Sequence, residues 1–145
     1  MIASAEEFVR LRTSVAPDEY RRAAHDEAPM AVWFDVIARF PDMKEWVAHN
    51  KTIPLEILDV LTRDADVRVR ATVAAKRKLA VEQFERLAAD PQETVRHAVA
   101  CNGKVPSQVL ERLATDGAAF VSAAAERRLQ QARPGAIDDS ASDPA

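Results

Sequence analysis

A spacing of 26 residues, repeated along the chain, constrains the fold more than any other feature. Three windows that begin at Leu58, Phe84 and Leu110 align at this offset, and the first two are identical at 7 of 22 positions. Self-similarity at a period of about 20 to 50 residues is typical of stacked repeats. The recurring positions form four sets, namely Leu61, Leu87 and Leu113; Asp64, Asp90 and Asp116; Val69, Val95 and Val121; and Val73, Val99 and Ala125.

Each window predicts two short antiparallel helices, because its apolar residues recur at helical spacing. In the first unit we expect Leu55, Leu58 and Leu61 to line the buried side of the first helix, with Val81 and Phe120 facing inward in the later units. No segment alternates apolar and polar residues at period two, so no strand is predicted. The predicted fold class is therefore all-α.

The chain divides by composition into three predicted regions. Residues 1–28 predict two capping helices, the first opened by a capping box in which Ser4 caps the helix and Glu7 reaches back to the N–H of the cap. Residues 29–131 predict helical repeats, the first of them divergent and rich in aromatic residues, with Trp46 facing inward. Residues 132–145 hold one large apolar residue and predict a disordered tail.

Charge and composition indicate which partners and which cellular locations to expect. The net charge is −3, which gives no overall attraction to nucleic acid or to an anionic membrane. No apolar run approaches the roughly 20 residues of a membrane-spanning helix, and the N-terminus lacks the apolar block of a secretory signal. We therefore expect a cytoplasmic protein that does not contact a membrane.

The clearest copy of the repeat carries the pattern Leu-x-x-Asp-x-x-x-x-Val-Arg-x-x-Val-Ala between Leu87 and Ala100. In this pattern the chain resembles the HEAT-like and variant leucine-rich repeats of bacteria. The resemblance implies a short right-handed α-solenoid of the armadillo type, with about four helix pairs, that binds another macromolecule. Some variant leucine-rich repeat proteins hold an iron–sulfur cluster on an N-terminal cysteine-rich segment, but this chain has no cysteine before Cys101. The third copy also departs from the pattern, with Ser122 in place of the arginine.

Residues that could carry catalysis or bind a metal are few. His49 and Cys101 occupy equivalent places two periods apart, which predicts a separation of roughly 20 Å, since packed helices lie about 8–10 Å apart. His97 and Cys101 are the one pair with ligand spacing on a single helix, and we expect Cys101 to be a small buried thiol. No phosphate-binding glycine loop or nucleophile motif is present. The chain is therefore predicted to be non-enzymatic, without cofactor or metal.

Two rows of charged residues follow the period. Asp64, Asp90 and Asp116 are expected to cap helices and to pair with basic residues of neighbouring repeats. The loops between repeats bring further cations to equivalent places, and residues 49–104 carry a net charge of +2 against −5 for the rest. These loops are either ordinary solvated loops or a basic edge that binds a partner. The candidate partner-binding residues are Asn50, Lys51, Arg70, Lys76, Arg77, Lys78, Arg96, Asn102 and Lys104.

These observations predict a protein–protein interaction module, a scaffold or adaptor whose partner has an acidic surface. A narrower version is an immunity- or antitoxin-type protein that binds a toxin. One alternative is a nucleic-acid-binding HEAT-like repeat protein, against which the acidic net charge and the expected lack of exposed aromatic residues in the regular repeats both count. Another is the regulatory subunit of an enzyme.

Overall fold

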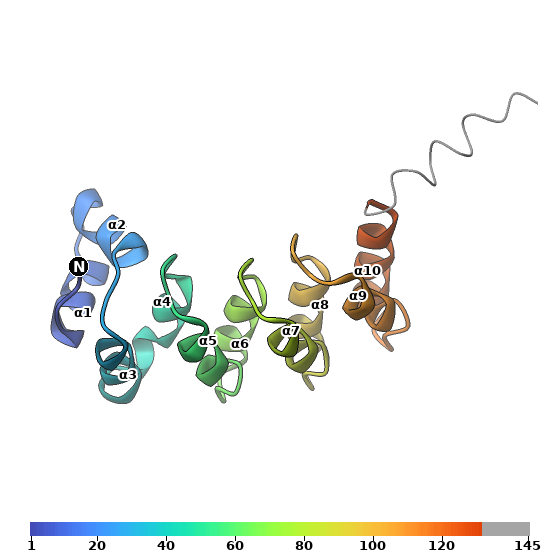
Figure 1. The fold of residues 1–145 in the computed structure, drawn as a ribbon, viewed down its shortest axis with the longest axis horizontal. Coiled ribbons are helices and arrows are strands. Elements are labelled where there is room, and N and C mark those ends of the chain that lie inside the picture. The colour runs from blue at the N-terminus through green and yellow to red at the C-terminus, as the bar shows by residue number, and fades with distance from the viewer. Residues whose placement is uncertain (132–145) are drawn as a thin grey trace, which may run out of the picture. The chain divides into compact units, whose positions relative to one another are not determined.

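The computed structural model describes residues 1–131, and every element of regular secondary structure in that range is a helix (Figure 1). The prediction of an all-α chain is thus confirmed, while the predicted tail at 132–145 lies outside the described residues. The helices are α1 (Ala5–Thr13), α2 (Pro17–His25), α3 (Met30–Arg39), the 3₁₀ helix η1 (Pro41–Met43), α4 (Lys44–His49), α5 (Leu55–Leu61), α6 (Val67–Ala74), α7 (Val81–Ala88), α8 (Glu93–Ala100), α9 (Ser107–Leu113) and α10 (Ala119–Gln131).

The helix starts keep the 26-residue spacing of the sequence. The first helices of three successive pairs begin at Leu55, Val81 and Ser107, and the second helices begin at Val67, Glu93 and Ala119. The preceding pair fits after a shift, because α3 begins at Met30, one residue later than the spacing would place it. Local sequence therefore sets where each helix of a pair begins.

The chain forms two compact units, and each is described here by itself. In the N-terminal unit, Met1–Val73, α1 packs against α2 and α3, while α3 also packs against η1, α4 and α5. Its largest fully buried side chain is Trp33, whose ring meets the ring of Phe8 edge-on at 5.3 Å between centroids. Burial of a large apolar side chain contributes about 1.5–3 kcal/mol, so this pair joins α1 firmly to α3.

The C-terminal unit is described from Ala74 to Gln131. Helix α7 packs against α8 and α9, and α10 packs against the same two helices (Figure 1). The repeated apolar positions supply its core, as expected: the buried residues include Phe84, Leu87, Val95, Val99, Leu110, Leu113, Val121 and Ala125.

In the regular repeats, three residues predicted to face inward are exposed instead. Leu55 and Val81 each stand at the first position of a helix, beyond the end of the buried stripe that their helices form further along. Phe120 stands beside the buried stripe of α10, which runs through Val121, and its ring lies against that of His97 at 5.1 Å. The inward prediction was therefore wrong at these helix ends, where the apolar period continues but the packing does not.

The start of α1 differs in one detail from a reciprocal capping box. Ser4 caps the helix, and its hydroxyl accepts the N–H of Glu7 at 3.1 Å. The carboxylate of Glu7, however, accepts the N–H of Ala3 at 2.8 Å, not that of Ser4. This hydrogen bond is the main cause that lowers the pKa of Glu7.

Candidate functional site

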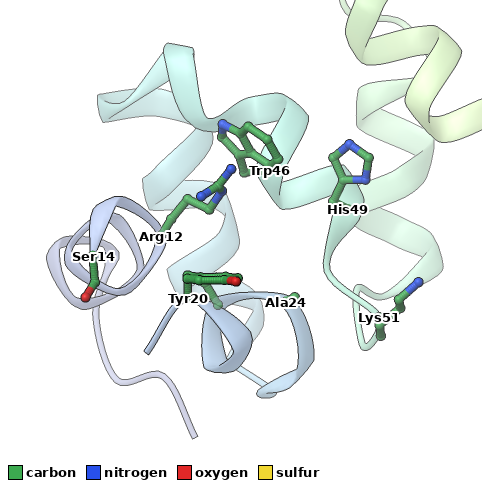
Figure 2. Close-up of a pocket in the computed structure, with 8 residues that line it drawn as sticks. Arg12, Ser14, Tyr20, Ala24, Trp46, His49 and Lys51 are labelled. Atoms are coloured by element: carbon green, nitrogen blue, oxygen red, sulfur yellow. The ribbon is translucent and has the colours of Figure 1, made fainter. Parts of the chain in front are cut away.

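A pocket of about 580 Å³ opens in the N-terminal unit between α1, α2 and the end of α4 (Figure 2). We call it the aromatic–basic pocket and define it by the residues that line it, which are Arg12, Ser14, Tyr20, Ala23, Ala24, Trp46, His49 and Lys51. Its walls come from three helices and one loop, so the pocket exists only in the folded unit.

The loop after α4 is held against α2 by a buried asparagine. The side-chain amide of Asn50 donates to the carbonyl oxygens of Ala23 at 2.8 Å and Asp26 at 3.0 Å. The backbone N–H of Lys51 adds a third hydrogen bond, at 2.7 Å, to the carbonyl of Ala24. Because these bonds join two walls of the pocket directly, its shape is organised before any ligand arrives.

The opposite wall is built on a stacked pair. The guanidinium carbon of Arg12 lies 3.4 Å from the centroid of the Trp46 ring, a cation–π arrangement. His49 follows Trp46 by three residues on α4, and the centroids of the two rings are 5.4 Å apart. Figure 2 shows Arg12 reaching toward Trp46, with Tyr20 on the opposite side of the pocket.

Trp46 was expected to face inward, and the structure corrects this. Its side chain is 36% exposed, while the next residues, Val47 and Ala48, are fully buried and take the inward side of α4. Tyr20, on the facing helix, is 47% exposed. The pocket thus presents two large aromatic rings to solvent.

The charges that line the pocket have one sign. Arg12 and Lys51 are cationic, His49 is titratable, and no lining residue is acidic. Ser14, one of the lining residues, donates its hydroxyl to the carboxylate of Glu19, which also accepts a hydrogen bond from Arg10. The bond from Ser14, followed by that from Arg10, lowers the pKa of Glu19.

A second asparagine organises the loops of the C-terminal unit. The amide of Asn102 donates to the carbonyl oxygens of Ala74 and Lys76, both at 2.8 Å, and its side-chain oxygen accepts the N–H of Lys104 at 2.8 Å. Residues 75–78 and 102–104 therefore lie side by side. We call these two segments the basic loops.

The basic loops bring several cations together. Arg77, Lys78 and Lys104 are exposed and Lys76 is half-buried. The guanidinium of Arg77 lies beside Gly103, where an added Cβ would be 3.8 Å from its Nη2 atom. Partial desolvation lowers the pKa of Lys78.

Both candidate asparagines are buried and stabilise the fold. Asn50 is fully buried and Asn102 is 4% exposed, and their amides are engaged by backbone groups of the same unit. The sequence predicts that these two residues contact a partner, because both lie in loops between repeats. Their burial removes them from the surface, and we leave them out of the proposed binding set.

The two candidate arginines, Arg70 and Arg96, also form hydrogen bonds within the fold. Arg96 makes a two-point ion pair with Asp116, at 2.7 and 3.1 Å, and donates to the carbonyl of Asp90 at 2.8 Å. Arg70 donates to the carbonyl of Asp64 at 2.8 Å. Lys51, Lys76, Arg77, Lys78 and Lys104 are the candidates that the structure leaves on surface loops.

Asp64 and Asp116 form ion pairs, as expected, but the aspartates of this row are not helix N-caps, because each stands three residues before the first residue of a helix. Asp64, Asp90 and Asp116 each accept the backbone N–H of the residue two places on, at 2.9 Å. Asp64 also pairs with Lys44 at 2.8 Å. The hydrogen bond from Arg96 is the main cause that lowers the pKa of Asp116.

Cys101 is exposed, not buried as we had expected. It follows the last buried residue of α8, Ala100, and its sulfur lies 3.5 Å from Nε2 of His97. Its carbonyl accepts a hydrogen bond from Arg128 at 2.6 Å. Among the described residues no group of three or more His, Cys, Asp or Glu side chains is placed to hold a metal ion.

The pocket residues Arg12, Tyr20 and Trp46 were missed by sequence reasoning. They lie outside the regular repeats, on three different helices, and no common spacing links them. The available signal was compositional: Tyr20 and two cations stand in or near the predicted capping helices, and Trp46 stands in the aromatic-rich first repeat.

Comparison of the chain with protein-family models, with curated proteins and with solved structures found no match. No helix within residues 1–131 is both long enough and apolar enough to cross a bilayer. Function is therefore inferred from the geometry of the chain's own residues.

Proposed function

We propose that the chain is a non-enzymatic protein-interaction module that binds an acidic surface of a partner protein through its basic loops. The observation that carries the proposal is the pair of hydrogen bonds from Asn102, which holds two loops side by side, with Arg77, Lys78 and Lys104 exposed on them. An immunity- or antitoxin-type protein is a narrower form of the same proposal.

The proposal includes the architecture that the resemblance implied, a short right-handed α-solenoid of HEAT-like or variant leucine-rich repeats. Its support is the constant 26-residue spacing of the helix starts and the burial of equivalent leucines in each pair. In such an architecture equivalent loops are displayed in a row, and the rows serve as extended binding surfaces.

The charge balance of the C-terminal unit favours an acidic partner. Its described residues hold an excess of two positive charges, although the whole chain is net negative. Asp116, moreover, is occupied by its ion pair with Arg96. Clustered cations accelerate the encounter with an acidic surface and make binding sensitive to salt.

Affinity capture from cells of the source organism tests the proposal. We expect the Arg77→Glu/Lys78→Glu/Lys104→Glu variant to recover its partner at least about tenfold less well than the unmodified chain, since reversed charges repel an acidic surface. The matched control changes the net charge equally through three exposed arginines outside the basic loops, Arg63→Glu in the turn after α5, Arg86→Glu on α7 and Arg112→Glu on α9. The proposal fails if the loop variant, folded by circular dichroism, keeps every partner that the control keeps.

Duplex nucleic acid is the alternative partner, since the same cations could contact phosphates. A fluorescence titration with duplex DNA at low and moderate salt distinguishes the two. Micromolar binding that weakens steeply with salt would support nucleic acid and contradict the protein proposal. The net charge of −3 leads us to expect no such binding.

A further inference from the structure

We infer that the aromatic–basic pocket is a second binding site, which takes a short acidic peptide segment of a partner protein with an aromatic or large aliphatic side chain among its carboxylates. The pocket lies in the N-terminal unit and shares no residue with the basic loops. The inference shares only the class of ligand with the proposed function, and the two can fail separately.

The walls of the pocket suit an apolar side chain. Tyr20 and Trp46 are both partly exposed, and tryptophan, tyrosine and arginine are the residues that contribute most to binding energy at protein interfaces. The volume of about 580 Å³ lies within the roughly 300–1,000 Å³ of pockets that enclose small ligands. A phenylalanine or leucine side chain would fit with room for neighbouring backbone.

The cation that faces this space is available to a ligand. Within residues 1–131, Arg12 makes no ion pair and no side-chain hydrogen bond, and its guanidinium carbon lies over the Trp46 ring, 3.4 Å from the centroid. A guanidinium fixed in this way presents its N–H groups at its edge, where a carboxylate can accept two of them. Lys51 supplies a second positive charge on the far side of the pocket.

The pocket is also organised in advance. The amide of Asn50 holds the loop that carries Lys51 against α2, and the Arg12–Trp46 stack joins α1 to α4. A ligand therefore does not have to order these walls, which lowers the entropic cost of binding.

The local charge favours a short acidic segment over a long polyanion. The residues that line the pocket hold two cations and no acid, whereas the N-terminal unit as a whole carries 10 Lys and Arg against 13 Asp and Glu. An extended nucleic acid would meet this surrounding negative charge along its backbone. A peptide with a few carboxylates interacts mainly with the pocket itself, because charges more than about 10 Å apart are largely screened at ordinary salt.

Tryptophan fluorescence provides the test. The probe is a capped peptide with one phenylalanine flanked on each side by glutamates, and the matched peptides replace the glutamates by glutamines or by lysines. Trp33 is buried and Trp46 lines the pocket, so a change in emission that is absent from Trp46→Phe reports occupancy of the pocket. We expect saturable binding of the glutamate peptide with a Kd of roughly 10–500 μM, a range that corresponds to a modest interface.

Variants identify the groups responsible. Arg12→Gln should weaken binding by about tenfold or more, because a charge-assisted hydrogen bond is lost. Arg21→Gln, on the exposed side of α2, should leave binding unchanged, and so should the triple charge reversal of the basic loops. Unchanged peptide affinity in that triple variant separates the two proposals.

Four results would overturn the inference. They are no saturable signal up to about 5 mM peptide, equal affinity for the lysine peptide, full binding by Arg12→Gln, and tighter binding of single-stranded oligothymidylate than of the glutamate peptide. The last result would identify the pocket as a site for nucleic-acid bases, which also stack on aromatic rings.

Discussion

Replacement of Asn102 by alanine should destabilise the C-terminal unit without any contact with a partner. The amide makes two donor hydrogen bonds and one acceptor bond, all at 2.8 Å, and the side chain is 4% exposed. Asn102→Ala removes all three bonds and leaves the carbonyls of Ala74 and Lys76 without this donor. At about 0.5–1.5 kcal/mol for each hydrogen bond, the expected loss is about 2–4 kcal/mol.

Urea unfolding followed by far-ultraviolet circular dichroism measures this loss, since both tryptophans lie in the other unit and do not report on it. The control is Gln108→Ala, at an exposed position of α9, for which we expect a change below about 0.5 kcal/mol.

An isosteric change sharpens the test. Asn102→Asp keeps the shape and the acceptor but places a carboxylate against two carbonyl oxygens, so we expect it to destabilise at least as much as alanine at neutral pH. A loss below about 0.5 kcal/mol for both variants would refute the structural role that we assign to this asparagine.

Three further predictions follow from burial and charge. Trp33→Ala should lower the free energy of unfolding by about 3–5 kcal/mol, whereas Trp46→Ala should cost about 1 kcal/mol, and equal losses in urea unfolding would contradict the pocket assignment. The hydrogen bond from Arg96 lowers the pKa of Asp116 from 3.8. The ion pair therefore stabilises the fold above about pH 4. This contribution is lost as pH falls further, because the unfolded chain binds the proton at a higher pH than the folded chain does. Asp116→Asn should flatten the dependence of unfolding free energy on pH in that range, and an unchanged slope would exclude the pair as its source. Cys101 should react with a thiol reagent in the folded protein at a rate close to that in denaturant, and protection by folding would contradict its exposure.

The sequence by itself determined the local features of this protein. The apolar spacing predicted helices and no strands, and the 26-residue period predicted where the second and third helix pairs begin. Asp64, Asp90 and Asp116 were predicted to bond to nearby backbone, and each accepts the N–H two residues on. That N–H lies in the turn before the helix, so the bond closes the turn and is not the predicted helix cap. Such contacts are encoded within a few residues and can be inferred from one helix or turn at a time.

The tertiary structure decided which polar and aromatic side chains are buried and which of them contact one another. Asn50 and Asn102 looked like surface loop residues, but their amides bond to backbone 24 to 28 residues earlier in the chain, so only packing reveals their role. Arg12 and Trp46 meet across 34 positions of sequence, on helices whose relative angle no periodicity specifies. Burial and stacking depend on how helices pack, and the same apolar stripe allows several packings that differ in which polar residues they enclose.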